Sequence, residues 1–163
     1  MSYLITQNCT GCTLCARLCP AGAIQGEKKQ RHRLDAELCI ECGACGRICP
    51  AQAVQDPFGQ VVKGEKRKDW KKPVFDLDVC MACGMCVDAC PAGCLAPGPP
   101  NPKDKTAYPV LADPGACLAC GFCVAECPVA AVVLAVPANP AFPGDSERGE
   151  ESAVGKTAGV GVR

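Results

Sequence analysis

One cysteine motif occurs four times in this chain of 163 residues, and it restricts the possible folds more than any other feature. Each copy has the spacing C-x2-C-x2-C-x3-C and is followed directly by proline. Four such copies do not arise by chance, so the chain must fold around them. The sixteen motif cysteines are Cys9, Cys12, Cys15, Cys19, Cys39, Cys42, Cys45, Cys49, Cys80, Cys83, Cys86, Cys90, Cys117, Cys120, Cys123 and Cys127.

The spacing within each copy predicts a tight loop followed by one short coil. The first three cysteines follow one another so closely that the backbone must turn around a single centre, with its N–H groups toward the sulfurs. The third and fourth cysteines are separated by about one helical turn. The proline that follows lacks an N–H group and limits the coil. Structural zinc sites instead use two separated Cys-x2-Cys pairs around one ion. The motif therefore predicts four [4Fe–4S] clusters.

Cysteine at this density is also typical of secreted disulfide scaffolds. The count of 17 is odd, however, and the segment from Met1 to Cys9 has no pattern of a signal peptide. The longest apolar run, Val129 to Val136, is too short to span a membrane. We therefore expect free thiols in a reducing compartment, the cytoplasm.

The repeats resemble those of bacterial polyferredoxins, in which two-cluster ferredoxin modules are fused. The resemblance covers residues 1 to about 136 and rests on all sixteen motif cysteines and their four prolines. It implies an α+β fold of two tandem ferredoxin-like modules with short strands and short helices. The shorter spacers favour pairing copy one with two and copy three with four, while a nested pairing of one with four and two with three stays open. The expected segments are module 1 at 1–56, a basic linker at 57–75, module 2 at 76–136 and a polar tail at 137–163, either disordered or a partner-docking arm.

The tandem pairing predicts four interleaved ligand sets. In bacterial two-cluster ferredoxins the fourth cysteine of each motif binds the neighbouring cluster. The first set is then Cys9, Cys12, Cys15 and Cys49, and the second is Cys39, Cys42, Cys45 and Cys19. The third is Cys80, Cys83, Cys86 and Cys127, and the fourth is Cys117, Cys120, Cys123 and Cys90.

The remaining cysteine and the only histidine have simpler interpretations. Cys94 occupies the slot that alanine fills in the other three repeats, so we expect a small buried residue. His32 lies in a polar, basic stretch, which favours a solvated loop residue.

Apolar and basic residues near the motifs allow two further predictions, one about access of water to the clusters and one about the segment between the modules. Ile40, Met81 and Leu118 each follow the first cysteine of a copy and are predicted to screen the clusters from water. The basic run from Lys63 to Lys72 surrounds Trp70, the only tryptophan, and indicates a solvated linker. A docking site for an acidic redox partner is the second interpretation of this run.

Charge is balanced over the whole chain but divided between its halves. There are 17 basic and 17 acidic residues, which gives no reason to expect nucleic acid as a partner. Residues 1–75 carry a net charge of +5, and residues 76–163 carry −5. This polarity predicts head-to-tail self-association, because a surface that complements the opposite end of the same chain is heterologous. Alternatively, the two ends meet different partners.

No residues form a constellation for substrate chemistry, so we expect a non-catalytic electron-transfer protein. A small four-cluster chain of this kind is similar to the electron-transfer subunit of tungsten-dependent aldehyde oxidoreductase complexes. That resemblance implies a catalytic tungsten or molybdenum oxidoreductase subunit and a flavin subunit that reduces NAD as partners. Formate dehydrogenase, hydrogenase and aryl-CoA reductase complexes use comparable subunits. The alternative is a free, diffusible low-potential ferredoxin that serves several partners.

The composition predicts that the clusters hold the fold together. Aromatic residues make up only 4% of the chain, so the apolar core is small. We expect protein stripped of iron to lose cooperative thermal unfolding, because ligation supplies much of the folding free energy. Calorimetry and circular dichroism before and after chelation would measure this. A chelated protein that still unfolds cooperatively would contradict it.

Overall fold

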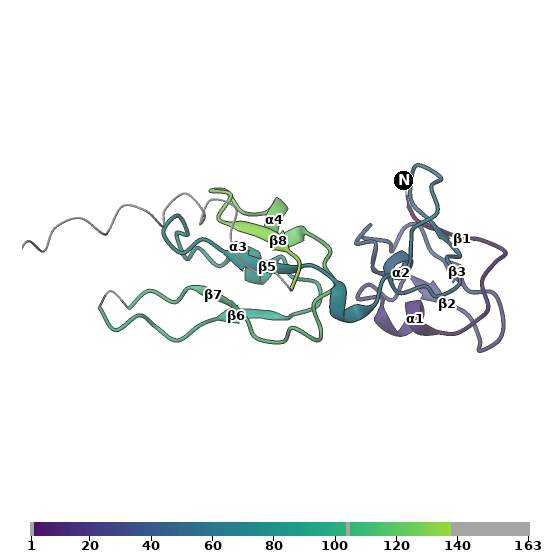
Figure 1. The fold of residues 1–163 in the computed structure, drawn as a ribbon, viewed down its shortest axis with the longest axis horizontal. Coiled ribbons are helices and arrows are strands. Elements are labelled where there is room, and N and C mark those ends of the chain that lie inside the picture. The colour runs from purple at the N-terminus through teal and green to yellow at the C-terminus, as the bar shows by residue number, and fades with distance from the viewer. Residues whose placement is uncertain (1, 104, 138–163) are drawn as a thin grey trace, which may run out of the picture.

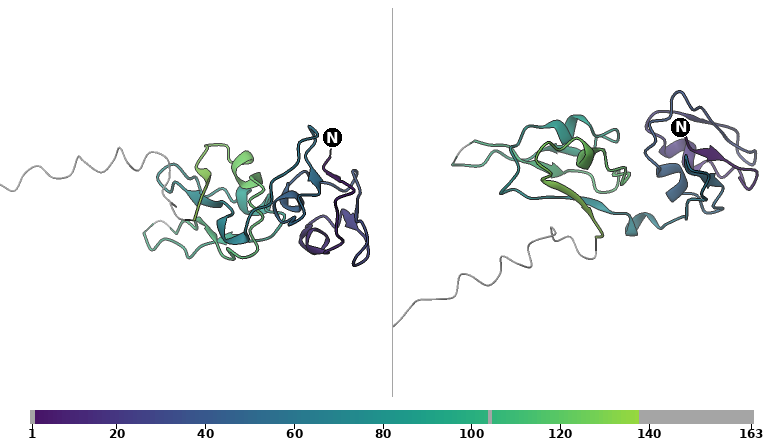
Figure 2. Two further views of the ribbon diagram at one scale, coloured as in Figure 1. Left: turned by 45° about the vertical axis from the view of Figure 1, so that its right-hand side comes forward. Right: turned by 90° about the horizontal axis from the view of Figure 1, so that it is seen from above.

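The computed structural model describes residues 2–103 and 105–137, and it has two lobes that lie side by side along the long axis (Figure 1). Each lobe contains two short helices and two antiparallel strand pairs. The views in Figure 2 show the same two lobes joined by one connecting segment. In the described part of the chain, no helix is long and apolar enough to cross a membrane.

The first lobe is formed by copies one and two. Its elements are β1 (Leu4–Ile5), α1 (Leu14–Leu18), β2 (Ile24–Gln25), β3 (Arg33–Leu34), α2 (Ala44–Arg47) and β4 (Val54–Gln55). Strand β1 pairs with β4, with Ile5 opposite Val54. Strand β2 pairs with β3, with Ile24 opposite Leu34. The strand before copy one is thus joined to the strand after copy two.

The second lobe repeats this arrangement with copies three and four. A 3-10 turn, η1 (Arg67–Asp69), precedes β5 (Lys72–Phe75), α3 (Met85–Asp88), β6 (Leu95–Pro97), β7 (Pro109–Leu111), α4 (Phe122–Ala125) and β8 (Val132–Ala135). Strand β5 pairs with β8, and β6 pairs with β7. This duplication confirms the α+β fold class and the tandem pairing, and the nested alternative is wrong.

A repeated backbone conformation forms each cysteine loop. In every copy the residues on both sides of the second cysteine have positive φ. Around Cys12 these are Gly11 at 66° and Thr13 at 65°, and around Cys83 they are Ala82 at 51° and Gly84 at 80°. Left-handed backbone is unfavourable for residues other than glycine, so Thr13 and Ala82 hold strain that the loop geometry must offset. The alternation turns the backbone around one centre.

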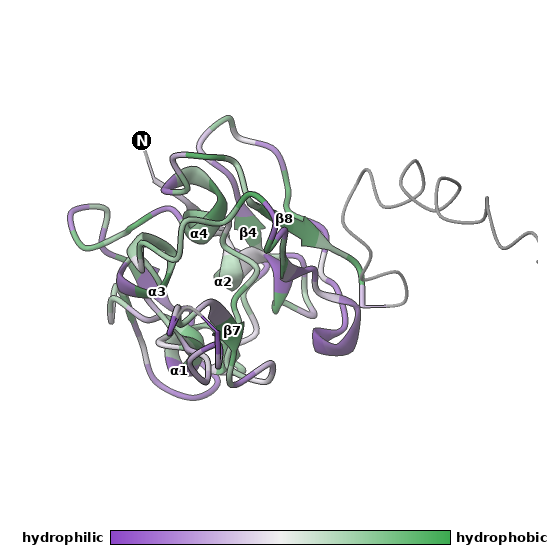
Figure 3. Ribbon diagram, turned by 90° about the vertical axis from the view of Figure 1, so that its left-hand side faces the viewer, coloured by the Kyte–Doolittle hydropathy of each residue, from purple (hydrophilic) through white to green (hydrophobic). Residues whose placement is uncertain are grey.

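Three small apolar cores hold the lobes and join them. The first-lobe core is centred on Ile5, Cys15 and Cys45. The second-lobe core is centred on Cys86, Cys117 and Cys123. The third core contains Ala44, Trp70 and Leu118, and it lies between the lobes. In Figure 3, α4 and β8 are coloured as apolar, whereas the loops alternate between apolar and polar stretches.

The segment expected to be a solvated basic linker is largely structured. Residues 72–75 form β5 of the second lobe, and Trp70 is fully buried, with 0% exposure. Lys63, Lys66, Lys68 and Lys71 are exposed, as expected for a solvated segment, whereas Trp70 departs from that expectation because its apolar ring packs into the third core. The predicted tail lies, except for Pro137, outside the described residues.

Candidate iron–sulfur centres

Four cavities are lined by motif cysteines, four in each. Site 1 contains Cys9, Cys12, Cys15 and Cys49, and site 2 contains Cys19, Cys39, Cys42 and Cys45. Site 3 contains Cys80, Cys83, Cys86 and Cys127, and site 4 contains Cys90, Cys117, Cys120 and Cys123. Each cavity therefore combines three cysteines of one copy with the fourth cysteine of the paired copy.

The four cavities are alike in size and lining. Their empty volumes are about 320, 300, 300 and 310 Å³ for sites 1 to 4. Apart from thiols, the side chains around them are mainly apolar, such as Ile5 and Val54 at site 1 or Met81 and Val132 at site 3. In the described residues, no three His, Cys, Asp or Glu side chains are placed to hold a single metal ion. The thiols surround a space instead, which fits the donor set of a cubane cluster.

Backbone N–H groups already point at the sulfur of the fourth cysteine. The amides of Ala23, Ala53 and Ala131 donate to the Sγ atoms of Cys19, Cys49 and Cys127 at 3.3, 3.3 and 3.2 Å. Such hydrogen bonds stabilise negative charge on sulfur. In these three copies, the backbone amide four residues after the last cysteine of the motif thus lies within reach of its sulfur.

Cys94 takes the alanine position in the third copy and is buried, as expected. It also lines site 4, so five thiols surround that cavity. Its Sγ lies 3.4 Å from Sγ of Cys90. Burial and the hydrogen bond with Cys90 raise the pKa of Cys94, so this thiol keeps its proton.

The crowded, buried thiols need a positive charge beside them before they can ionise. Burial, reinforced by neighbouring thiolates, raises the pKa of Cys15 to about 11 and that of Cys45 and Cys123 to about 12. Without metal these groups remain protonated at neutral pH. Iron must displace the protons, and in return it relieves the repulsion between the thiolates.

His32 is a site residue that the sequence analysis missed. It is 1% exposed and lines site 1 beside Cys9 and Cys12. Nδ1 lies 3.1 Å from the carbonyl oxygen of Gln30, so Nδ1 carries a proton and donates it. Nε2 is buried without a hydrogen-bond partner. The prediction of a solvated loop residue was wrong because Gly26 lets the chain close over the ring: a Cβ on Gly26 would lie 2.8 Å from Cγ of His32.

The sites follow one another in the order 1, 2, 4, 3. Cys15 of site 1 and Cys45 of site 2 share the first-lobe core, and Cys86 of site 3 and Cys123 of site 4 share the second-lobe core. Cys42 of site 2 and Cys120 of site 4 pack against the core between the lobes. The pKa of Cys42 is raised by burial, then by the thiolates of Cys19 and Cys120, which also shows that Cys42 and Cys120 are neighbours across the lobe boundary.

Screening by the residue after the first cysteine differs between the sites. Leu118 is 3% exposed, as predicted, because it packs between the lobes. Ile40 and Met81 line the cavities of sites 2 and 3 as well, but they are 36% and 60% exposed, so each covers its site with one face and meets solvent with the other. Among the motif cysteines, Cys12 of site 1 and Cys83 of site 3 are exposed. The most exposed motif cysteines thus belong to the two outermost sites.

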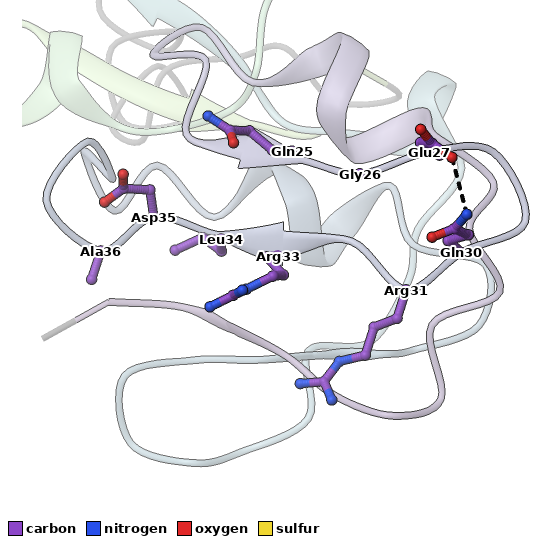
Figure 4. A pocket seen from close by; sticks show the side chains of 9 residues that line it. All are labelled: Gln25, Gly26, Glu27, Gln30, Arg31, Arg33, Leu34, Asp35 and Ala36. Atoms are coloured by element: carbon purple, nitrogen blue, oxygen red, sulfur yellow. Dashed lines mark hydrogen bonds between the residues drawn. The ribbon is translucent and has the colours of Figure 1, made fainter.

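A more open groove lies beside the hairpin of β2 and β3, away from the thiols. It has an empty volume of about 1190 Å³ and is lined by polar residues such as Gln25, Arg31 and Arg33 (Figure 4). Gln30 donates a 3.0 Å hydrogen bond to Glu27 at its rim. It brings together no nucleophile and base.

Comparisons with known proteins identify the domains. Residues 8–53 and 79–131 each match a 4Fe-4S dicluster domain, one in each lobe, and a second profile of the same description matches residues 31–91, which include copies two and three. The chain belongs to the 4Fe-4S dicluster domain family. Its two domains form a polyferredoxin-type fusion, and they hold four [4Fe–4S] clusters.

Two individual proteins are similar over part of the chain. A "Ferredoxin-like protein in nif region" from Nostoc sp. is 45% identical over 38 residues, which are 23% of this chain and 33% of that protein. A chain of the formate dehydrogenase–heterodisulfide reductase–formylmethanofuran dehydrogenase complex from Methanospirillum hungatei is 25% identical, with a TM-score of 0.41. That alignment covers 77% of this chain and 47% of the other. This dicluster protein therefore spans less than half of each.

The ligand sets can be tested by comparing serine variants. We expect Cys19→Ser to alter the same cluster as Cys39→Ser, and Cys49→Ser to alter the same cluster as Cys9→Ser, because these pairs line the same cavities. Iron content and electron paramagnetic resonance (EPR) spectra of the four variants would be compared. If the spectrum of Cys19→Ser matches that of Cys9→Ser instead, the assignment is wrong.

The buried histidine gives a second test. We expect His32→Leu to raise the midpoint potential of the site 1 cluster alone, because with the ring proton on Nδ1 the unpartnered Nε2 presents a lone pair beside a negatively charged cluster, and leucine removes it. An EPR-monitored redox titration would measure the potentials. Arg33→Leu, an exposed neighbour, is the matched control. Equal effects of the two variants, or a shift spread over all clusters, would contradict the prediction.

Proposed function

We propose that this protein is the electron-transfer subunit of an oxidoreductase complex and relays single electrons through sites 1, 2, 4 and 3 in that order. The observation that carries the proposal is the packing of the sites in series: Cys15 and Cys45 share the first-lobe core, Cys42 and Cys120 pack against the core between the lobes, and Cys123 and Cys86 share the second-lobe core. When bound, each [4Fe–4S] cluster takes up or releases one electron. The sixteen cysteines are proposed as its ligands, in the four sets that line the cavities.

The side chains and backbone around the four sites exclude water from the electron path and fix the distances between the sites. Apolar side chains such as Val54 and Leu95 exclude water from the inner faces of the sites. Backbone amides stabilise negative charge at the fourth cysteine of a motif. Among residues 2–103 and 105–137 no substrate-binding groups come together, and we assign catalysis to a partner.

Partners are proposed to dock at the two ends of the series, where Cys12 and Cys83 are exposed. The surface around site 3, formed by Leu77, Val79, Met81 and Met85, is apolar and exposed. Asp76, Asp78 and Asp88 lie in the same segment. A redox partner with an apolar contact surface and a basic rim would complement it.

The partners inferred from the resemblance are a catalytic tungsten or molybdenum oxidoreductase subunit, with aldehyde oxidation as the leading candidate reaction, and a flavin subunit that reduces NAD. The cytoplasm suits 17 cysteines that must stay reduced until iron binds. The division of charge between the halves also supports head-to-tail association of copies. A free, diffusible ferredoxin is the second candidate function, and the exposed polar face around Cys12 would suit transient contacts.

Co-purification of the tagged holoprotein from its native host tests the proposal. A permanent subunit elutes in fixed stoichiometry with a molybdenum- or tungsten-containing protein and a flavoprotein. A holoprotein that elutes alone at all salt concentrations, yet is reduced by several added partners, would favour the free ferredoxin.

The apolar surface around site 3 gives a sharper prediction. We expect Met81→Asp to slow electron exchange with the co-purified partner about tenfold or more, because a charge in an interface core is costly. Stopped-flow absorbance of the clusters would measure the rate. Phe58→Asp, which alters an 81% exposed apolar residue of the first lobe, is the control. Equal rates for both variants, with full cluster content, would place the docking surface elsewhere.

A further inference from the structure

The only tryptophan of the chain lies where the two lobes meet. Trp70 is 0% exposed and packs with Ala44 of the first lobe and Leu118 of the second. Its Nε1 donates a 3.2 Å hydrogen bond to the carbonyl oxygen of Glu65. Cys42 of site 2 and Cys120 of site 4 pack against the same core. Trp70 thus belongs to a core that borders both inner sites.

Arg47 connects the cysteine loops on the two sides of this boundary. Its Nη2 donates to the carbonyl oxygen of Cys42 at 2.7 Å and to that of Leu118 at 2.8 Å. One guanidinium group therefore joins the loop of site 2 to the loop of site 4. The same group lies 5.5 Å from the centre of the Trp70 ring.

Arg67 and Lys72 add further contacts to the segment that leads into site 4. Arg67 lies 4.8 Å from the centre of the Trp70 ring, and its Nη2 donates to the carbonyl oxygen of Gly115. Lys72 Nζ donates to the carbonyl oxygens of Pro114 and Cys117, at 2.8 and 3.4 Å. Three cations therefore bind the backbone of the segment 114–118, which leads into site 4.

The connecting segment is also fixed to the first lobe. The amide of Glu65 donates a 2.8 Å hydrogen bond to the carbonyl oxygen of Arg47. Gly64 lies so close to the first lobe that a Cβ there would be 2.5 Å from the carbonyl oxygen of Cys49. The segment is consequently packed on both lobes and does not act as a free tether.

We propose that Arg47, Trp70 and Arg67 form a clasp, the interlobe clasp, that holds the site 2 and site 4 loops together and keeps a fixed positive charge between them. The inference rests on the proposed electron relay, for which this boundary is the only step between lobes in the described residues. In that step one electron leaves the cluster of one inner site, which is oxidised, and enters the cluster of the other, which is reduced. Arg47 and Trp70 are positioning residues, because they act through the loops they hold.

The positive charge of Arg47 also affects how easily the two inner clusters are reduced. A fully cysteine-ligated cluster carries negative charge, and each electron adds more. A guanidinium that contacts the loops of both inner sites stabilises the reduced form of each. Removing the charge should therefore make both inner clusters harder to reduce, while the outer sites 1 and 3 are less affected.

The positioning role is tested with the holoprotein. In Trp70→Ala we expect all four clusters to bind, a larger radius of gyration by small-angle X-ray scattering, and loss of magnetic coupling between the two inner clusters by pulsed EPR. Coupling within each lobe should remain. Trypsin cleavage at the basic residues around position 70 should become about tenfold faster as the boundary opens. Phe58→Ala, an exposed aromatic residue, is the control and should behave as the unmodified protein.

The charge role is tested separately by two variants of Arg47. Arg47→Gln should shift the midpoint potentials of the inner clusters downward, whereas Arg47→Lys should keep them close to the original values. If Trp70→Ala fails to bind clusters, Trp70→Phe replaces it and should give a smaller increase in radius and weaker coupling. Unchanged scattering and coupling in the tryptophan variants would overturn the clasp. Equal potentials in both Arg47 variants would overturn the charge role.

These measurements need no partner protein, so failure of the clasp and failure of the proposed function can be told apart. A protein with an intact clasp that accepts no electrons from any co-purified partner would contradict the relay only. A working relay with unchanged geometry in Trp70→Ala would contradict the clasp only.

Discussion

The bond between cysteine thiolate and iron is the interaction on which the rest of this structure depends. Thiols such as Cys45 and Cys123, buried among other thiols, have a pKa raised to about 12 and would stay neutral without a cation. In the proposed ligation, each set of four thiolates cross-links two copies of the motif, because the fourth cysteine in each cavity comes from the paired copy. Strands of two to four residues then suffice to close each lobe.

That constraint explains the backbone as well as the core. A loop that turns three thiols toward one centre needs left-handed residues on both sides of its second cysteine, and the chain accepts them even at Glu41 and Ala119. Such conformations cost of order 1 kcal/mol each at residues with a side chain. They are tolerable here because ligation supplies a large folding free energy. The metal sites thus allow a fold that its apolar residues alone would not specify.

The sequence was sufficient for the features set by regular spacing. Cys9, Cys12, Cys15 and their counterparts predict the clusters, and the shorter spacers predict the tandem lobes that strands β1–β4 and β5–β8 form. It was insufficient where contacts depend on residues distant in the chain. His32 lies at site 1 because Gly26 and Gln30 pack around its ring. Trp70 is buried because Leu118 of the second lobe packs against it. No periodic pattern encodes either contact.

Equivalent positions in the repeats differ in how deeply they are buried, and this difference distinguishes the inner sites from the outer ones. Leu118 and Met81 stand at the same place in their repeats, yet one is 3% exposed and the other 60%. The difference arises because the first lobe covers the loop of Leu118 and nothing in the described chain covers that of Met81. Duplicating the motif therefore did not duplicate its surroundings: the inner pair of sites packs against the core between the lobes, whereas the outer pair contains the two exposed motif cysteines, Cys12 and Cys83. Electron exchange with a partner is fastest where a site lies nearest the surface, so we expect docking specificity at the ends of the series.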